Sequence, residues 1–148
     1  MKLEIRELGP DELDALLELY AHLHESDDPL PARSRVEQEW DRVCADPALI
    51  YLGGFHNGAL VSSCTAAIVP NFTRGLRPYA VIENVVTRAD LRGQGVGSRV
   101  LQALLEHCRA AGCYKVMLQS AAARDAAHRF YCANGFDPDA KQAFIVRQ

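Results

Sequence analysis

The hydrophobic residues of the first third of the chain follow two patterns, one typical of strands and one of helices. Residues 2–8 alternate charged and apolar side chains, as a strand with one buried face does. Gly9 and Pro10 then begin a helix, because proline suits the first helical position, and leucines recur at helical spacing over residues 13–23. Residues 34–45 repeat the helical pattern, so a second helix is predicted there.

Two apolar segments follow, and both are predicted to be strands. Residues 50–55 and 59–69 are joined across Asn57 and Gly58, a pair that strongly indicates a tight hairpin. After a polar loop over residues 70–78, a further apolar strand begins.

The second half of the chain continues with helices and strands in turn. Residues 96–111 form an amphipathic pattern that Gly112 ends. Residues 114–119 contain an uninterrupted apolar run, which is typical of a buried central strand. Residues 124–134 predict a short helix and residues 141–147 a last strand. The predicted order is β-α-α-β-β-β-α-β-α-β, in a single domain of residues 1–148.

Residues 81–98 read as an apolar strand, a short polar turn, a glycine-rich loop and the start of a helix. Glycine exposes backbone N–H groups, and the first turn of a helix carries unpaired N–H groups with a partial positive charge. Arg92 adds a permanent cation. The segment therefore predicts a phosphate or pyrophosphate site at a strand–loop–helix junction.

The spacing of these glycines narrows the class of anion site. A Walker loop needs a lysine, and none occurs between Lys2 and Lys115. The glycines at 93, 95 and 97 also differ from a dinucleotide fingerprint. Residues 92–97 instead resemble the Arg/Gln-x-x-Gly-x-Gly/Ala signature of the GNAT superfamily of N-acetyltransferases, and residues 129–136 resemble its Phe-Tyr-x-x-x-Gly-Phe motif.

The resemblance covers nearly the whole chain. It implies an α/β (α+β) GNAT fold, with a mixed central sheet of about six to seven strands flanked by about four helices. It also implies acetyl-CoA as cosubstrate, and a bulged strand whose amides near Val85 meet the acyl group. The residues implied to line the cosubstrate are Val85, Val86, Thr87, Arg92, Gly93, Gln94, Gly95, Val96, Gly97 and Ser98.

Glu83 and Tyr131 are the candidate catalytic residues. Glu83 is a lone carboxylate in an apolar strand, where partial burial would raise its pKa and suit it to act as general base, directly or through water. The alternative is a carboxylate that pairs with an arginine or faces solvent. Tyr131 matches the motif tyrosine that protonates the departing sulfur. The alternative is a core aromatic beside Phe130.

The acceptor is expected to be a small-molecule primary amine. Asn71, Arg74, Arg77 and Glu83 are the candidate acceptor-binding residues, and the arginines would suit a phosphate, phosphonate or carboxylate group; scattered surface arginines are the alternative. Residues 82–86 and 112–116 resemble segments of glucosamine-6-phosphate N-acetyltransferases. Residues 125–131 resemble a helix of aminoalkylphosphonate N-acetyltransferases.

Composition narrows the function further. The 148 residues are 49% hydrophobic and carry a net charge of −3, which argues against a nucleic-acid surface. No apolar run approaches the roughly 20 residues of a membrane span, and no signal peptide is evident. Five cysteines without metal-ligand spacing indicate reduced thiols, hence a cytoplasmic protein and no metal site. His22 and His24 point to different helix faces, so they predict no metal either.

The sequence thus predicts an N-acetyltransferase that transfers an acetyl group to a small amine by direct attack. A protein or peptide N-acetyltransferase is one alternative, and a non-catalytic acyl-CoA-binding regulator is another. Glu83 and Tyr131 together count against the regulator. Pairing of two copies through a sheet edge or the last strand is a further implication of the resemblance.

Overall fold

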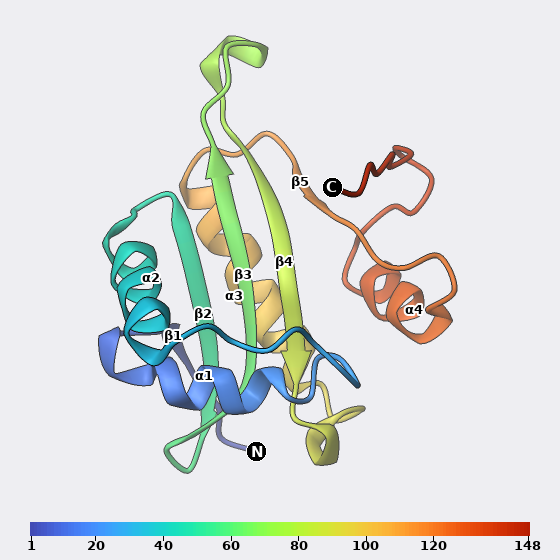
Figure 1. The fold of residues 1–148 in the computed structure, drawn as a ribbon. Coiled ribbons are helices and arrows are strands. Elements are labelled where there is room, and N and C mark those ends of the chain that lie inside the picture. The colour runs from blue at the N-terminus through green and yellow to red at the C-terminus, as the bar shows by residue number, and fades with distance from the viewer.

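The computed structural model describes all of residues 1–148, which form one mixed sheet of five strands (Figure 1). The strands lie side by side in chain order, the first four antiparallel and the fifth parallel to the fourth. They are β1 (Glu4–Glu7), β2 (Leu49–His56), β3 (Ala59–Val69), β4 (Tyr79–Thr87) and β5 (Val116–Leu118).

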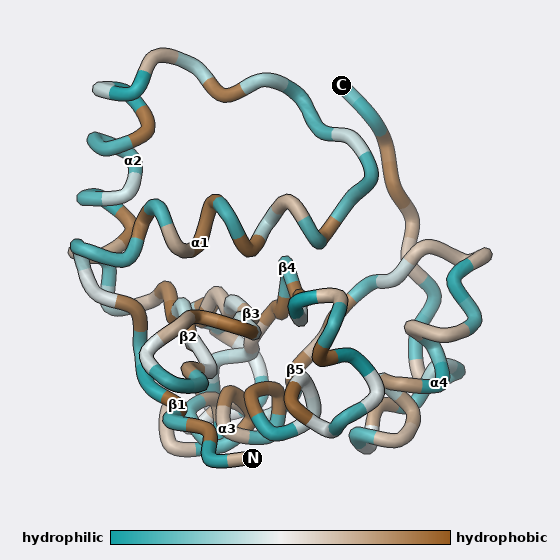
Figure 2. Tube along the Cα trace, turned by 90° about the horizontal axis from the view of Figure 1, so that it is seen from below, coloured by the Kyte–Doolittle hydropathy of each residue, from teal (hydrophilic) through white to brown (hydrophobic).

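Helices cover both faces of this sheet. Helices α1 and α2 lie on one side and α3 on the other, whereas α4 lies beside the sheet near the C-terminal residues (Figures 1 and 2). Their bounds are α1 (Leu13–Tyr20), α2 (Arg33–Ala45), α3 (Val96–Ala110) and α4 (Asp125–Ala133). Short 3₁₀ turns occupy Pro10–Glu12, Arg74–Leu76 and Ala89–Leu91.

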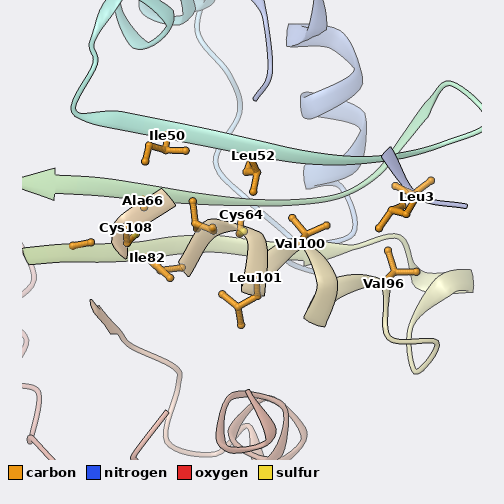
Figure 3. Packing of buried hydrophobic residues seen from close by; sticks show 13 residues of the cluster. Leu3, Ile50, Leu52, Cys64, Ala66, Ile82, Val96, Val100, Leu101 and Cys108 are labelled. Carbon is orange, nitrogen blue, oxygen red and sulfur yellow. The ribbon is translucent and has the colours of Figure 1, made fainter. Parts of the chain in front are cut away.

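Two hydrophobic clusters hold the layers together. The larger lies between the sheet and α3, where Leu52, Ile82 and Leu101 are at most 1% exposed (Figure 3). The smaller lies under α1 and α2 and includes Leu16 and Trp40. Each fully buried side chain of this size contributes about 1.5–3 kcal/mol, so the helical faces seen in the sequence fix the positions of the helices on the sheet.

The β2–β3 hairpin confirms the predicted turn. Asn57 and Gly58 both have positive φ, 50° and 79°, as the tight turn between right-twisted strands requires. The first strand, the two early helices and α3 also occur where the sequence predicts them, within a few residues at each end.

Two predictions for the C-terminal third are wrong. β5 is a three-residue strand at the edge of the sheet rather than a central strand, because the chain after Leu118 turns away from β4. Residues 141–147 form no strand, since no partner strand within the chain pairs with them. The sheet therefore has five strands, not six or seven, although the order of elements holds as far as α4.

The unpaired C-terminal segment exposes three consecutive apolar side chains. Phe144, Ile145 and Val146 are 85%, 66% and 81% exposed. None of the helices has the length and apolar character that crossing a membrane would require.

Candidate active site

β4 contains a bulge in its second half. Ser63 pairs with Val86 and Thr65 pairs with Glu83, so Asn84 and Val85 together face the single residue Cys64. Asn84 takes the extra turn with a φ of 51°, a left-handed conformation that asparagine tolerates better than most residues. The bulge that the family resemblance implied near Val85 is confirmed.

The sheet opens at the same place. The last residue pair between β4 and β5 is Ile82 with Leu118, whereas β4 itself continues to Thr87. The second half of β4 therefore has β3 along one edge and no strand along the other (Figure 1). Of the predicted contact residues on this stretch, Val86 is buried and Val85 and Thr87 are half-buried. Backbone groups along this edge can meet a ligand.

Glu83 is the residue directly before the bulge, where β4 parts from β5. Its side chain is exposed, so the partial burial expected from its apolar strand is not found. β5 ends opposite Ile82, so no strand lies beside Glu83 on that edge of the sheet either. Glu83 faces water, where it can exchange a proton with an incoming amine or with solvent.

Tyr131 lies on α4 and packs against the larger hydrophobic cluster. Its half-buried ring makes edge contacts with Phe130 and Phe136, at centroid distances of 5.2 and 6.0 Å. Burial raises the pKa of Tyr131, Arg124 opposes that shift, and Glu83 is near enough for its charge to add to it. The structure thus brings Glu83 and Tyr131 into mutual electrostatic range, with the phenol held protonated.

The glycine loop connects β4 to α3. Gly93 and Gly95 have positive φ, 73° and 78°, which accounts for glycine at both positions. Gly97 is required for a different reason, because a Cβ there would lie 2.8 Å from Thr87 Oγ1. No side chain caps the start of α3, so its first N–H groups stay available to an anion.

Arg92 ties this loop to two other elements. Its guanidinium donates hydrogen bonds to the carbonyl oxygens of Thr87 (3.1 Å) and His22 (2.6 Å). The imidazole of His22 in turn accepts a 3.4 Å hydrogen bond from the Ala89 amide. The end of α1, the end of β4 and the loop therefore meet around one cation.

The remaining loop residues are held by neighbouring polar groups. Gln94 donates to the Asp90 carbonyl oxygen (3.1 Å), and Ser98 accepts from the Asn134 side chain at the end of α4 (3.1 Å). Val96 packs into the core and offers a ligand only its backbone. The uncapped helix, the open loop and the unpaired strand edge fit a long ligand with a pyrophosphate at one end.

Asn71, Arg74 and Arg77 lie at the other end of β4, in the β3–β4 connection (Figure 1). Arg77 precedes Glu83 by roughly 20 Å of extended strand, so the structure does not bring the two together. The arginines stand over the ring of Tyr114, at 6.0 and 5.6 Å from its centroid.

Lys115 joins this basic group, with its ammonium 5.4 Å from the Tyr114 centroid. Arg74, Arg77 and Lys115 form no ion pair with any carboxylate. No three His, Cys, Asp or Glu side chains gather into a group that could hold a metal ion.

The sequence interpretation missed the buried polar residues of β3, two of which bond to β4 beside the bulge. Ser62, Ser63 and Thr65 are buried in β3, and each donates a side-chain hydrogen bond to a neighbouring strand. The sequence contained a signal for them, because three hydroxyl residues interrupt the otherwise apolar segment of residues 59–69. Asn84 was likewise visible as a residue that favours left-handed backbone.

Comparison with known proteins identifies the class. The sequence model of the acetyltransferase (GNAT) family matches residues 13–136, and the chain belongs to this family. Over 121 residues it is 38% identical to glucosamine 6-phosphate N-acetyltransferase of Trypanosoma brucei brucei, covering 80% of each protein. A putative acetyltransferase from Agrobacterium tumefaciens str. C58 superposes with a TM-score of 0.91 at 41% identity, over 98% of this chain and 99% of that one.

A more distant structure shares the fold alone. The aminoglycoside N-acetyltransferase AAC(6')-Iy, solved in complex with CoA, superposes with a TM-score of 0.82 at 15% identity, over 99% of this chain and 95% of that one. As a GNAT family member the chain is an N-acetyltransferase, and acetyl-CoA is its acetyl donor.

Proposed function

We propose that this enzyme acetylates the primary amine of a small molecule, with Glu83 as general base and Tyr131 as general acid. The observation that carries the proposal is the bulge in β4 where this strand parts from β5, with Glu83 directly before it and Tyr131 near enough to feel the charge of Glu83. Acetyl-CoA supplies an activated acyl group and a thiolate leaving group.

The protein groups have separate tasks in this proposal. Glu83 accepts a proton from the substrate ammonium, directly or through water, which frees the lone pair that attacks the acyl carbon. Backbone N–H groups at Asn84 and Val85 stabilise the negative charge that develops on the acyl oxygen. Tyr131 donates its proton to the departing sulfur. The new C–N bond replaces the C–S bond. The nitrogen loses its second proton as the tetrahedral intermediate collapses, and this proton restores the Tyr131 phenol, while Glu83 releases the first proton to solvent.

The cosubstrate site follows the same elements. Val85, Val86 and Thr87 would line the pantetheine along the open edge of β4. The pyrophosphate would lie at the start of α3, against the backbone of Gly93, Gln94, Gly95, Val96, Gly97 and Ser98. Arg92 adds positive charge there while holding the loop in place.

The proposed acceptor is an amine that also bears a phosphate or phosphonate, with glucosamine 6-phosphate as the first to test. The relative from Trypanosoma brucei brucei, named for that substrate, supports this choice. Asn71, Arg74 and Arg77 remain the proposed anion ligands. Their side chains would reach along β4 toward Glu83, with the acceptor between them.

The proposal also includes a homodimer. Phe144, Ile145 and Val146 form an exposed apolar segment of strand-like composition, and β5 offers a short open edge. Both features are costly in water, and a second copy with the same features could cover them.

A panel assay tests the acceptor. Purified enzyme and acetyl-CoA are incubated with glucosamine 6-phosphate, glucosamine, 2-aminoethylphosphonate, a polyamine and a lysine peptide, and acetylated products are measured by mass spectrometry. This readout avoids thiol reagents, which would react with the exposed Cys44 and Cys132. We expect a higher kcat/KM for glucosamine 6-phosphate than for glucosamine. Turnover of the peptide alone would contradict a small-molecule acceptor.

The anion ligands are tested on the same two sugars. Replacement of Arg74 and Arg77 by glutamine should raise KM for glucosamine 6-phosphate and leave KM for glucosamine unchanged. Arg42→Gln, which removes an exposed arginine from α2, is the matched control. Equal effects on both sugars would remove the arginines from phosphate recognition.

A further inference from the structure

Two buried hydroxyl groups of β3 bind the carbonyl groups on either side of the bulge. Thr65 Oγ1 donates a 2.9 Å hydrogen bond to the carbonyl oxygen of Glu83, just before the bulge. Ser62 Oγ donates a 2.9 Å hydrogen bond to the carbonyl oxygen of Val86, just after it. These side chains are 6% and 1% exposed, so water cannot replace them at either carbonyl.

From this geometry we propose that Thr65 and Ser62 are positioning residues, which set the direction of the Asn84 and Val85 amides toward the acyl oxygen. The inference rests on the proposed function of those amides. Asn84 is held at a φ of 51°, and such a conformation persists only where surrounding contacts determine it. The two hydroxyl groups provide contacts of this kind, one on each flank.

The hydrogen bonds of Ser62 also connect the bulge to the glycine loop. Ser62 has one proton, which goes to the Val86 carbonyl, so Thr87 is the donor in the 2.9 Å hydrogen bond between the two hydroxyl oxygens. Thr87 Oγ1 in turn packs against Gly97 in the first turn of α3. One chain of contacts thus links the acyl end of the site to the pyrophosphate end.

Ser63 provides a matched control on the same strand. It is as buried as Ser62, and its Oγ also donates a 2.9 Å hydrogen bond to a carbonyl oxygen. That carbonyl belongs to Leu52 on β2, on the side away from the bulge. Ser63→Ala therefore removes the same kind of bond but no side-chain hydrogen bond to the carbonyl groups that flank the bulge.

The experiment compares Ser62→Ala, Thr65→Val, Thr65→Ser and Ser63→Ala. We expect Ser62→Ala and Thr65→Val to lower kcat by roughly tenfold or more while KM for acetyl-CoA changes little, because a catalytic donor displaced by a fraction of an ångström loses most of its effect. Thr65→Ser keeps the hydroxyl group and should retain kcat. Ser63→Ala should lower the melting temperature like Ser62→Ala but leave kcat intact.

A second readout does not depend on turnover. The NMR shifts of the Asn84 and Val85 amides should move in Ser62→Ala and Thr65→Val and stay in place in Ser63→Ala. If the wild-type enzyme acetylated no amine, the proposed function would fail. These shifts would still show whether Ser62 and Thr65 position the two amides. The positioning role would be overturned if folded Ser62→Ala and Thr65→Val kept the wild-type amide shifts and the wild-type kcat. It would also be overturned if Ser63→Ala changed the shifts and kcat as much as they do.

Discussion

The guanidinium of Arg92 lies 2.6 Å from the carbonyl oxygen of His22, so the end of α1 is fastened to the loop that is proposed to hold the pyrophosphate. Arg92→Lys keeps the charge but not the planar fork that reaches two carbonyl groups. We expect the variant to bind acetyl-CoA roughly tenfold more weakly, which calorimetry would measure. Affinity equal to wild type would show that only the charge matters.

Gly97 and Gly93 should respond to alanine for different reasons. A Cβ on Gly97 would meet Thr87 Oγ1 at 2.8 Å, whereas one on Gly93 would meet nothing within 4 Å. Gly97→Ala should therefore cost about 1–3 kcal/mol of stability through overpacking. Gly93→Ala should cost about 1–2 kcal/mol through its positive φ alone.

Adding Thr87→Ala to each variant separates the two causes. The truncation removes the atom that a Cβ at position 97 would contact, so it should recover part of the loss in Gly97→Ala and none in Gly93→Ala. Chemical denaturation of the single and double variants gives the coupling free energy between position 87 and each glycine. Equal coupling at the two glycines would contradict the steric account.

Tyr131→Phe removes the proposed proton donor and leaves the ring packed between Phe130 and Phe136. We expect kcat to fall by roughly a hundredfold, with acetyl-CoA affinity unchanged. Because burial raises the pKa of Tyr131 above its ordinary value of 10, the phenol stays protonated at all lower pH. The wild-type rate should therefore show no fall below about pH 10 that depends on Tyr131. A fall near pH 8 that Tyr131→Phe abolishes would contradict this assignment.

Glu83→Gln removes the proposed base from an exposed position at the opening of the sheet. We expect turnover at neutral pH to fall by about 10²–10⁴-fold. The deficit should shrink as pH rises past the pKa of the acceptor, because an amine that is already neutral needs no base. Rate profiles over pH for both enzymes provide the measurement. A deficit that is constant with pH would point to acceptor binding instead.

The apolar C-terminal segment predicts an effect on assembly. Phe144→Ser combined with Val146→Ser should convert a dimer of about twice the 16.3 kDa chain mass into a monomer, as light scattering would show. Phe72→Ser is the control, since Phe72 is 92% exposed in the β3–β4 connection. A wild-type monomer would contradict the proposed dimer.

The sequence predicted those parts of the molecule that depend on local pattern or on a family motif. The Asn57-Gly58 turn, the faces of α1 and α3 and the glycine loop are of this kind. The position of β5 was mispredicted because an apolar run of three residues reads alike in a central and in an edge strand. Residues 141–147 show strand propensity, but the chain supplies no partner for them.

The sequence indicated candidate residues for the site, but it did not indicate their exposure or their contacts. The bulge beside Glu83 and the point where β5 ends depend on how whole strands pair, which the neighbours of Glu83 in sequence do not encode. The bond from Arg92 to His22 and the bonds from Ser62 and Thr65 to β4 join distant segments, so no local pattern shows them. Such contacts exist only once the sheet and α1 are assembled.

The separation of β4 from β5 also has a consequence for the stability of the enzyme. From Glu83 to Thr87, β4 has no strand along one edge, and a ligand bound there as proposed would take the place of the missing strand. Donor binding would then complete the sheet as well as fill a site. At about one hundred times its Kd, such a ligand adds about 2.7 kcal/mol to the stability of the enzyme. Acetyl-CoA bound in the proposed site would then stabilise the sheet as well as take part in the reaction.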